Sequence, residues 1–209
     1  MVDLGSGGRV LVFAVGVESS GIPTAWAAAA ASSGVHLLRA ISDGTADELV
    51  ERVHGYKRHG DIALVSIHWG ENWGYEVPGA HVRFAHRLID GGVDLIHGHS
   101  SHHPRPIEIY RNKLVLYGCG DFITDYEGIR GHEPFRDDLV VMYVPDLDPE
   151  TGELVDLHLT PLQIRRMQLV HPSVEDRDWL RERLAIMSRD FSGDVQRRRA
   201  LAAAAGSDS

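Results

Sequence analysis

The sequence is poor in cysteine, in basic residues and in long apolar runs. Cys119 is the single cysteine among 209 residues, which excludes an internal disulfide framework and a zinc site built from several thiolates. Lysine and arginine total 21 against 30 aspartate and glutamate residues, giving a net charge of -9. A general nucleic-acid-binding protein needs a basic surface, so we expect no nucleic-acid partner. No run of about 18 apolar residues occurs, so we expect no membrane-spanning helix.

The N-terminal segment MVDLGSGGRVLVFAV also lacks the basic stretch and long apolar run of a signal peptide. As written, the chain is therefore expected to be soluble and intracellular. Apolar residues make up 43% and charged residues 24%, which is ordinary for a globular protein. The length fits one good-sized domain. We predict a domain over residues 1–192 and a disordered tail over residues 193–209, which end in AAAAGSDS.

The first half of the chain alternates between predicted strands and predicted helices. Continuous apolar runs predict buried strands at Arg9–Val15, Asp61–Ile67 and Val93–Ile96. Capping residues and periodicity predict helices at Thr24–Ala31, Thr45–Arg58 and Ala80–Asp90. The second of these helices is expected to start with a capping box, Thr45-x-x-Glu48. This βαβαβ order predicts an α/β fold in which helices cover a parallel sheet.

The second half of the chain is predicted to consist mainly of antiparallel strands. One hairpin is expected from Ile107–Tyr110 and Leu114–Tyr117, and a second from Leu139–Val144 and Leu154–Thr160. A third strand, Gln163–Leu169, and a final amphipathic helix, Ser173–Arg189, are expected to follow.

Histidine is the residue type that this sequence has in excess. Ten of the 13 histidines fall between His54 and His132, and several of these follow directly on predicted strands. His68 follows one strand, and His97 to His103 follow the next. Ligands bind at the carboxyl ends of the strands of a parallel sheet, so two separate loops are expected to deliver imidazoles to the same edge.

Several imidazoles on strand-end loops are typical of a site for Zn, Mn, Fe or Ni. We therefore predict His68, His99 and His102 as metal ligands. His97 is expected to alternate to the other side of its strand and to be structural. The alternative is that these histidines simply pack at the strand ends.

Other polar and aromatic residues lie near these loops in the sequence. Glu108 is a candidate for orienting an imidazole, and Asp121 ends another strand at the same edge. Arg105 is a candidate for meeting an anionic substrate. The remaining candidates for a supporting or substrate-contacting role are His103, Trp69 and Glu71. Cys119 is expected to be a small buried apolar residue.

Taken together, three segments resemble the CapA family of capsule and poly-gamma-glutamate biosynthesis proteins, which are similar to calcineurin-like metallophosphatases. These segments are SIHWGENWGYEVP, RFAHRLIDGGVDLI and HGHSSHHPRPIEIYRNKLVLYGCGDFI, and they occur in the order of the family's motifs. The match runs from about Arg9 to Ile123 and more loosely to Leu169. The resemblance implies a four-layer α/β/β/α sandwich with a two-metal site.

The same resemblance assigns individual residues. The family's strand-end histidine matches His68, its G-H-x-x-H loop matches His99 and His102, and its P-I-E glutamate matches Glu108. The family's usual asparagine is Asp121 here. The family's opening blocks, which carry the remaining metal ligands and the catalytic histidine, have no counterpart before Arg9. The resemblance thus implies the later part of the domain only, without its N-terminal strands. The membrane anchor or secretion signal typical of these cell-surface proteins is also expected to be missing.

Three functions follow from these observations as hypotheses. The first is a CapA-like protein that acts in the synthesis or export of an anionic polymer. It would bind a divalent metal ion (Mn, Fe or Zn) at an incomplete two-metal site. It would be a metal-dependent hydrolase when the domain is complete. Its substrate would be an anionic polymer or a phosphoester, and its partners other polymer-synthesis proteins of the membrane. The second is a non-enzymatic accessory or polymer-binding subunit. The third is an inactive truncated fragment.

Overall fold

The computed structural model describes residues 1–3, 7–124 and 129–191 and shows an α/β fold. The predicted tail at 193–209 lies outside these residues. Seven strands form the larger sheet, in the order β1-β2-β4-β5-β7-β6, and β3 also pairs with β2. These strands are β1 (Val2–Asp3), β2 (Arg9–Val17), β3 (Leu37–Leu38), β4 (Ile62–His68), β5 (Leu95–His99), β6 (Ile107–Tyr110) and β7 (Lys113–Leu116).

The centre of this sheet is parallel, as the βαβαβ order predicts. Strands β2, β4, β5 and β7 run in the same direction, and β6 pairs antiparallel with β7 at one edge. The carboxyl ends of β4 and β5 therefore lie next to each other, with His68 paired to His99 in the register.

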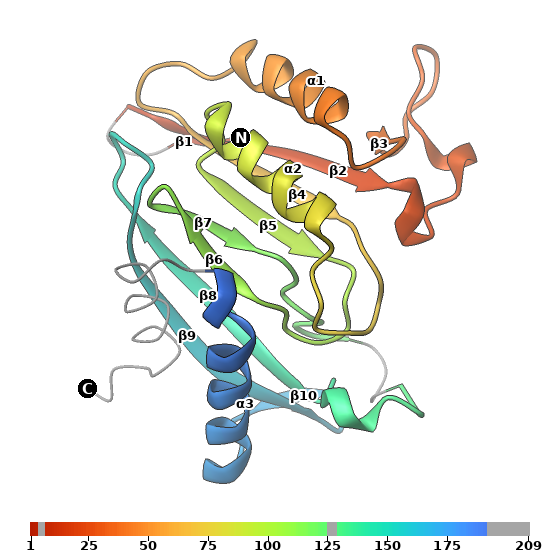
Figure 1. Ribbon diagram of the computed structural model, residues 1–209, viewed down its shortest axis with the longest axis vertical. Helices are drawn as coiled ribbons and strands as arrows, with labels where there is room; N and C mark the ends of the chain where they lie inside the picture. Colours follow the sequence, from red (N-terminus) through yellow and green to blue (C-terminus); the bar gives the residue numbers. More distant parts are fainter. Residues whose placement is uncertain (4–6, 125–128, 192–209) are drawn as a thin grey trace.

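Helices α1 (Asp43–His54) and α2 (Gly79–Asp90) lie side by side on one face of the sheet (Figure 1). They cover a core to which the helices contribute Leu49 and Phe84 and the strands Val65 and Ile67. The predicted capping box is wrong in its position. Helix α1 begins two residues earlier, because the Ser42 hydroxyl accepts a hydrogen bond from the Thr45 N–H at 3.2 Å and caps the first turn.

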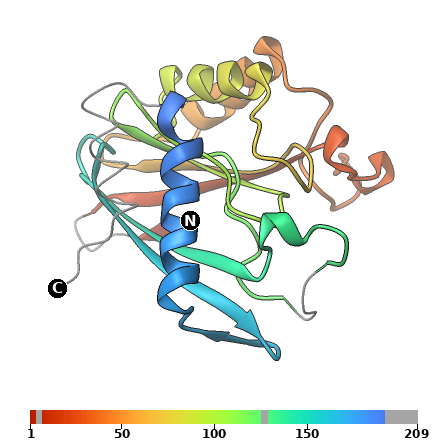
Figure 2. The same cartoon turned by 60° about the horizontal axis from the view of Figure 1, so that its bottom comes forward.

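A second, antiparallel sheet lies on the other side of the large sheet (Figure 2). It consists of β8 (Leu139–Leu147), β9 (Leu154–Arg165) and β10 (Gln168–Val170), and helix α3 (Val174–Met187) follows it. Leu180 and Leu184 of α3 join a second core cluster with residues of β6 to β9. The described residues thus form an α layer, two sheets and α3 beside them, and they do not confirm the full four-layer sandwich.

Two predicted elements differ from the structure. The expected helix Thr24–Ala31 is only a short 3-10 helix (Thr24–Trp26). The chain then folds back on itself, so that Ala27 bridges Val35 and Ala29 bridges Ser32. Alanine favours helix, but a helix of two turns is marginal unless tertiary packing supports it.

The expected single strand Gln163–Leu169 is two strands joined by a turn at Arg166 and Met167. Both turn residues have positive φ angles, 51° and 60°, as a two-residue hairpin turn of this hand requires. Neither residue is a glycine or asparagine, so the sequence carries no signal for this turn.

None of the helices within the described ranges is both long enough and apolar enough to cross a bilayer.

Candidate metal centre at the strand ends

Two histidines meet at the carboxyl ends of the central strands. His68 is the last residue of β4 and His99 is the last residue of β5. Their Nδ1 atoms lie 3.2 Å apart, and their ring centroids are separated by 5.2 Å. The parallel register explains this meeting, because it sets the two residues directly opposite each other.

Ser66 and a third histidine, His97, lie two residues before His68 and His99 on the same two strands. The Ser66 hydroxyl is 3.2 Å from His97 Nδ1 and 3.3 Å from His99 Nε2. The expectation that His97 turns to the other side of its strand is wrong. Residues two apart in a strand share a face, so His97 lies on the same face as His99, with ring centroids 5.5 Å apart.

The imidazoles face the second sheet rather than the helices. A hollow of about 440 Å³ between the two sheets is lined by both His97 and His99. Its other walls are mainly apolar and include Leu64, Leu95, Cys119, Phe122 and Tyr143. The histidine cluster therefore borders a mainly apolar hollow.

This environment disfavours the protonated form of the imidazoles. Burial lowers the pKa of His68 and of His97 below the usual value. Burial, together with the neighbouring His97 and His68, lowers the pKa of His99 to about 4. Neutral imidazole is the form that binds a metal ion, so no proton has to be removed from His99 near neutral pH.

The third predicted ligand, His102, belongs to a separate pair. Its Nδ1 lies 2.8 Å from Asp121 Oδ2, so the structure does bring these two predicted residues together. The His102 backbone N–H donates to the Asn72 carbonyl at 3.0 Å, which ties the two strand-end loops to each other. Trp73 packs against the His102 ring, with centroids 5.2 Å apart.

The donor set at this edge fits a metal ion only in part. Two nitrogens bound to one tetrahedral zinc at 2.0–2.1 Å would be about 3.3 Å apart, close to the separation of the His68 and His99 nitrogens. In the described part of the chain, however, the three predicted histidines do not form a closely spaced triad. Ligand atoms that all lie within 4.8 Å of one another are instead found in Asp146, Asp156 and His158. This group is exposed and lies on β8 and β9 of the second sheet, not at the ends of β4 and β5.

His103 is a fully buried aromatic residue. Its ring stacks on Phe135 at 4.8 Å and meets the Tyr75 ring edge-on at 4.7 Å. Its Nδ1 lies 3.0 Å from the Pro104 carbonyl, and burial lowers its pKa to about 4. The structure thus places His103 in the packing beneath the loop.

Arg105 is turned toward the backbone. Its guanidinium donates to the carbonyls of Glu71, Trp73 and Glu76 at 3.0 to 3.4 Å, and the side chain is buried. It therefore holds the loop after β4 in place. Glu71 accepts one of these hydrogen bonds through its backbone carbonyl.

Trp69 lies on the helix side of the sheet. It is buried, it stacks on His81 with centroids 4.8 Å apart, and its indole N–H donates to the Tyr117 carbonyl at 3.1 Å. These contacts make Trp69 part of the core under α2 rather than part of the hollow between the sheets.

Glu108 does contact an imidazole, but not one of the cluster. Its carboxylate lies 2.9 Å from His86 Nε2 on α2 and accepts a hydrogen bond from the Tyr117 hydroxyl at 2.5 Å. The strand register explains this placement. Glu108 is paired with Val115, whose side chain lies in the core under the helices, so Glu108 points to the same face and away from His68 and His99.

The residue that sequence reasoning missed is Ser66. The sequence does contain a signal for this residue, because Ser66 and His68 are two positions apart in one strand and therefore share a face. Cys119 is buried, and burial raises its pKa to about 12, which agrees with the prediction of a small apolar residue.

Comparison with known proteins places this arrangement in a family. The sequence profile described as "Bacterial capsule synthesis protein PGA_cap" matches residues 1–126, which include β4, β5 and both strand-end loops. A stretch of 192 residues is 51% identical to a "Probable polyglutamine synthesis accessory protein" of Mycobacterium tuberculosis. That match covers 91% of this chain and 50% of the relative.

More distant relatives carry related names. The "PGA biosynthesis protein CapA" of Bacillus subtilis is 33% identical over 87 residues, which is 42% of this chain and 22% of that protein. The "Capsule biosynthesis protein CapA" of Bacillus anthracis is 28% identical over 87 residues, or 42% of this chain and 20% of that protein. This chain spans about half the length of the mycobacterial relative. Because the profile covers more than half of its residues, the chain belongs to the bacterial capsule synthesis family PGA_cap.

Proposed function

We propose that this chain acts in the synthesis or export of an anionic extracellular polymer and that its strand-end histidines hold a divalent transition metal. The observation that carries the proposal is the approach of His68 Nδ1 and His99 Nδ1 to 3.2 Å at the carboxyl edge of a parallel sheet. Mn, Fe and Zn all accept imidazole ligands. When bound, such an ion would polarise an oxygen of the substrate or lower the pKa of a water molecule.

The chain's own residues would supply part of that site. His68 and His99 would take two positions on one ion. His102 would be a ligand at a neighbouring position, and the Asp121 carboxylate, 2.8 Å from its ring, would orient it. Further ligands would have to come from elsewhere, so the pair of metals expected for a hydrolase is incomplete in the described residues. A phosphoester or a carboxylate-rich polymer is the substrate class that such a site favours. Other polymer-synthesis proteins of the membrane are the proposed partners.

A non-enzymatic accessory role is the second candidate, and one observation favours it. Arg105, the cation nearest to the site in sequence, is committed to three backbone carbonyls and so does not point at a substrate. In that case the metal would hold a polymer or a partner protein without turning it over. The mycobacterial relative is itself named an accessory protein.

The metal site is tested by titrating the apoprotein with Mn²⁺ and Zn²⁺ in a calorimeter. We expect one tight site in the wild type and at least a tenfold loss of affinity in His68→Ala and in His99→Ala. The matched control is His158→Ala, which removes the imidazole of the exposed Asp146–Asp156–His158 group and should leave tight binding unchanged. Equal binding by His99→Ala and wild type would contradict the proposal.

The two candidate roles are separated by an assay of the metal-loaded protein on bis-p-nitrophenyl phosphate. Turnover that disappears in His99→Ala supports the hydrolase role. Tight metal binding without turnover supports the accessory role.

A further inference from the structure

His132 is a histidine near the strand-end edge that belongs to neither the His68–His99 pair nor the His102–Asp121 pair. It lies directly before the short 3-10 helix Glu133–Phe135, in the segment that leads into β8. Its ring is partly exposed and hydrogen-bonds to no other residue in the parts of the chain that the structure describes. Imidazole carries at least one N–H donor in either protonation state, so His132 has a donor to offer to a ligand.

The ring of Trp73 holds His132 beside the candidate site. The two rings stack almost parallel, with centroids 4.0 Å apart and 7° between their planes. Trp73 also contacts the ring of His102, whose Nδ1 lies 2.8 Å from Asp121 Oδ2. At most one indole ring therefore lies between His132 and the His102–Asp121 pair.

The Trp73 side chain is itself fixed by its neighbours. The buried Arg105 donates to the Trp73 carbonyl at 3.3 Å. The ring of Phe135, three residues after His132, lies 5.6 Å from the Trp73 ring and stacks on the buried His103 at 4.8 Å, measured between centroids. Protein contacts alone thus set the position of the His132 ring, and a preorganised donor loses less conformational freedom when a ligand binds.

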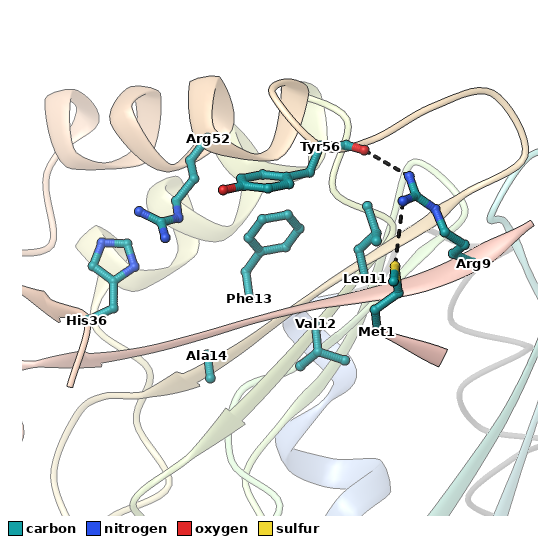
Figure 3. Close-up of a pocket in the computed structure, with 9 residues that line it drawn as sticks. All are labelled: Met1, Arg9, Leu11, Val12, Phe13, Ala14, His36, Arg52 and Tyr56. Atoms are coloured by element: carbon teal, nitrogen blue, oxygen red, sulfur yellow. Dashed lines mark hydrogen bonds between the residues drawn. The ribbon is translucent and has the colours of Figure 1, made fainter. Parts of the chain in front are cut away.

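The arginines beside another hollow of the molecule lie away from this edge. Figure 3 shows Arg9 and Arg52 around a hollow of about 480 Å³ beside β2. Arg9 is paired with Asp61 at the start of β2, whereas the candidate site lies at the ends of β4 and β5. Arg52 belongs to α1, on the helix side of the sheet. Because Arg105 is committed to backbone carbonyls, His132 is a donor that remains free to meet an anion at the strand-end edge.

We propose that His132 is a specificity-determining residue that donates a hydrogen bond to a second acidic group of a polymeric substrate. This role rests on the proposed function, because it places a first acidic group of the same polymer at the metal. A polymer with an acidic group on every unit brings the second group to His132 at high effective concentration once the first is bound. A single carboxylate or a small phosphoester makes the first contact alone. His132 thus favours the polymer over its monomer, and Trp73 is the positioning residue of His132.

The test compares a short γ-linked glutamate oligomer with free glutamate as ligands of the zinc-loaded protein, with binding followed by NMR. His132→Phe keeps the stacking on Trp73 and removes both ring nitrogens. We expect this variant to bind the oligomer about five- to tenfold more weakly, with its affinities for free glutamate and for Zn²⁺ unchanged. His132→Gln keeps an N–H donor and should recover part of the loss. The matched control is His171→Phe, at an exposed histidine after β10, which should bind the oligomer like the wild type.

The signals of the His132 ring give a second readout. We expect them to shift when the oligomer binds and to stay in place when free glutamate binds. Urea unfolding of His132→Phe should match that of the wild type, which separates a lost contact from a damaged fold.

A zinc titration of the wild type distinguishes failure of this role from failure of the proposed function. If the wild type binds zinc and the oligomer, and His132→Phe binds the oligomer equally well, the role of His132 is overturned while the metal site stands. Equal losses in His132→Phe and His132→Gln, or a parallel loss of free glutamate binding, would also overturn it. A wild type that binds neither zinc nor the oligomer overturns the proposed function and the role of His132 with it.

Discussion

At the residue scale, the side chains considered for the candidate site lie on two opposite faces of the large sheet. Ser66, His68 and His99 contact one another on the face of the sheet where His99 lines the hollow, whereas Glu108 and Trp69 face the helices. The face on which a side chain lies follows from the alternation of side chains along its strand, and not from its distance in sequence to the histidines. This is why Glu108 lies beside His86 although it is only nine residues from His99.

Glu108 is expected to stabilise the fold rather than the metal site. Glu108→Ala would leave the buried Tyr117 hydroxyl without its acceptor, at a cost of about 1–3 kcal/mol in the free energy of unfolding. Glu108→Gln keeps an acceptor and should cost less. Urea unfolding measures both. Unchanged stability of Glu108→Ala, together with a loss of metal binding, would contradict this structural role.

The ion pair of Arg9 and Asp61 predicts a pH dependence of stability. The Arg9 guanidinium holds the pKa of the Asp61 carboxyl well below its usual range. A carboxyl with a lowered pKa stabilises the folded state above the unfolded-state pKa of about 3.9, and this stabilisation is lost as the pH falls below it. Between pH 7 and pH 3, the wild type should therefore lose more stability than Asp61→Asn does. Parallel losses in urea unfolding at the two pH values would contradict this assignment.

At the scale of elements, the sequence predicted those that carry strong local signals. The apolar runs of β2, β4 and β5 and the helices α1, α2 and α3 are all present, because continuous burial and capping residues are local features. The elements that differ depend on contacts distant from those signals. The alanine-rich segment after Thr24 folds back on Val35 instead of forming a helix, and the turn at Arg166 and Met167 forms without a glycine or asparagine.

The corrected start of α1 leads to a prediction about its cap. The Ser42 hydroxyl accepts the Thr45 N–H, so Ser42→Ala should lower the free energy of unfolding by about 1 kcal/mol. Thr45→Ala leaves that bond intact and should cost clearly less. Thermal or urea unfolding of the two variants decides between them. A larger loss in Thr45→Ala would restore Thr45 as the capping residue.

At the scale of the whole molecule, the candidate site follows from topology. The parallel order of β4 and β5 brings two loops to one edge, and this could be predicted from the βαβαβ pattern. The division of the histidines into a His68–His99 pair and a His102–Asp121 pair could not, because it depends on how the loop after β5 turns. The hollow behind the first pair depends on the second sheet, whose packing the sequence pattern does not reveal.

The net charge of -9 bears on the proposed polymer partner. An acidic protein repels an anionic polymer over distances set by the ionic strength, so contact has to be made through a local cation. We expect poly-gamma-glutamate to bind only to the metal-loaded protein, and we expect EDTA to abolish that binding. Ultracentrifugation with labelled polymer measures it. Metal-independent binding that weakens with salt would instead indicate a basic surface patch.

The central claim is that His68 and His99 are ligands of one metal ion, and X-ray absorption at the edge of the bound metal tests it most directly. For Zn²⁺ or Mn²⁺ bound to the wild type, we predict the multiple-scattering pattern of two imidazoles, reduced to one in His99→Ala. A spectrum that shows only oxygen ligands, identical in wild type and His99→Ala, would contradict the claim.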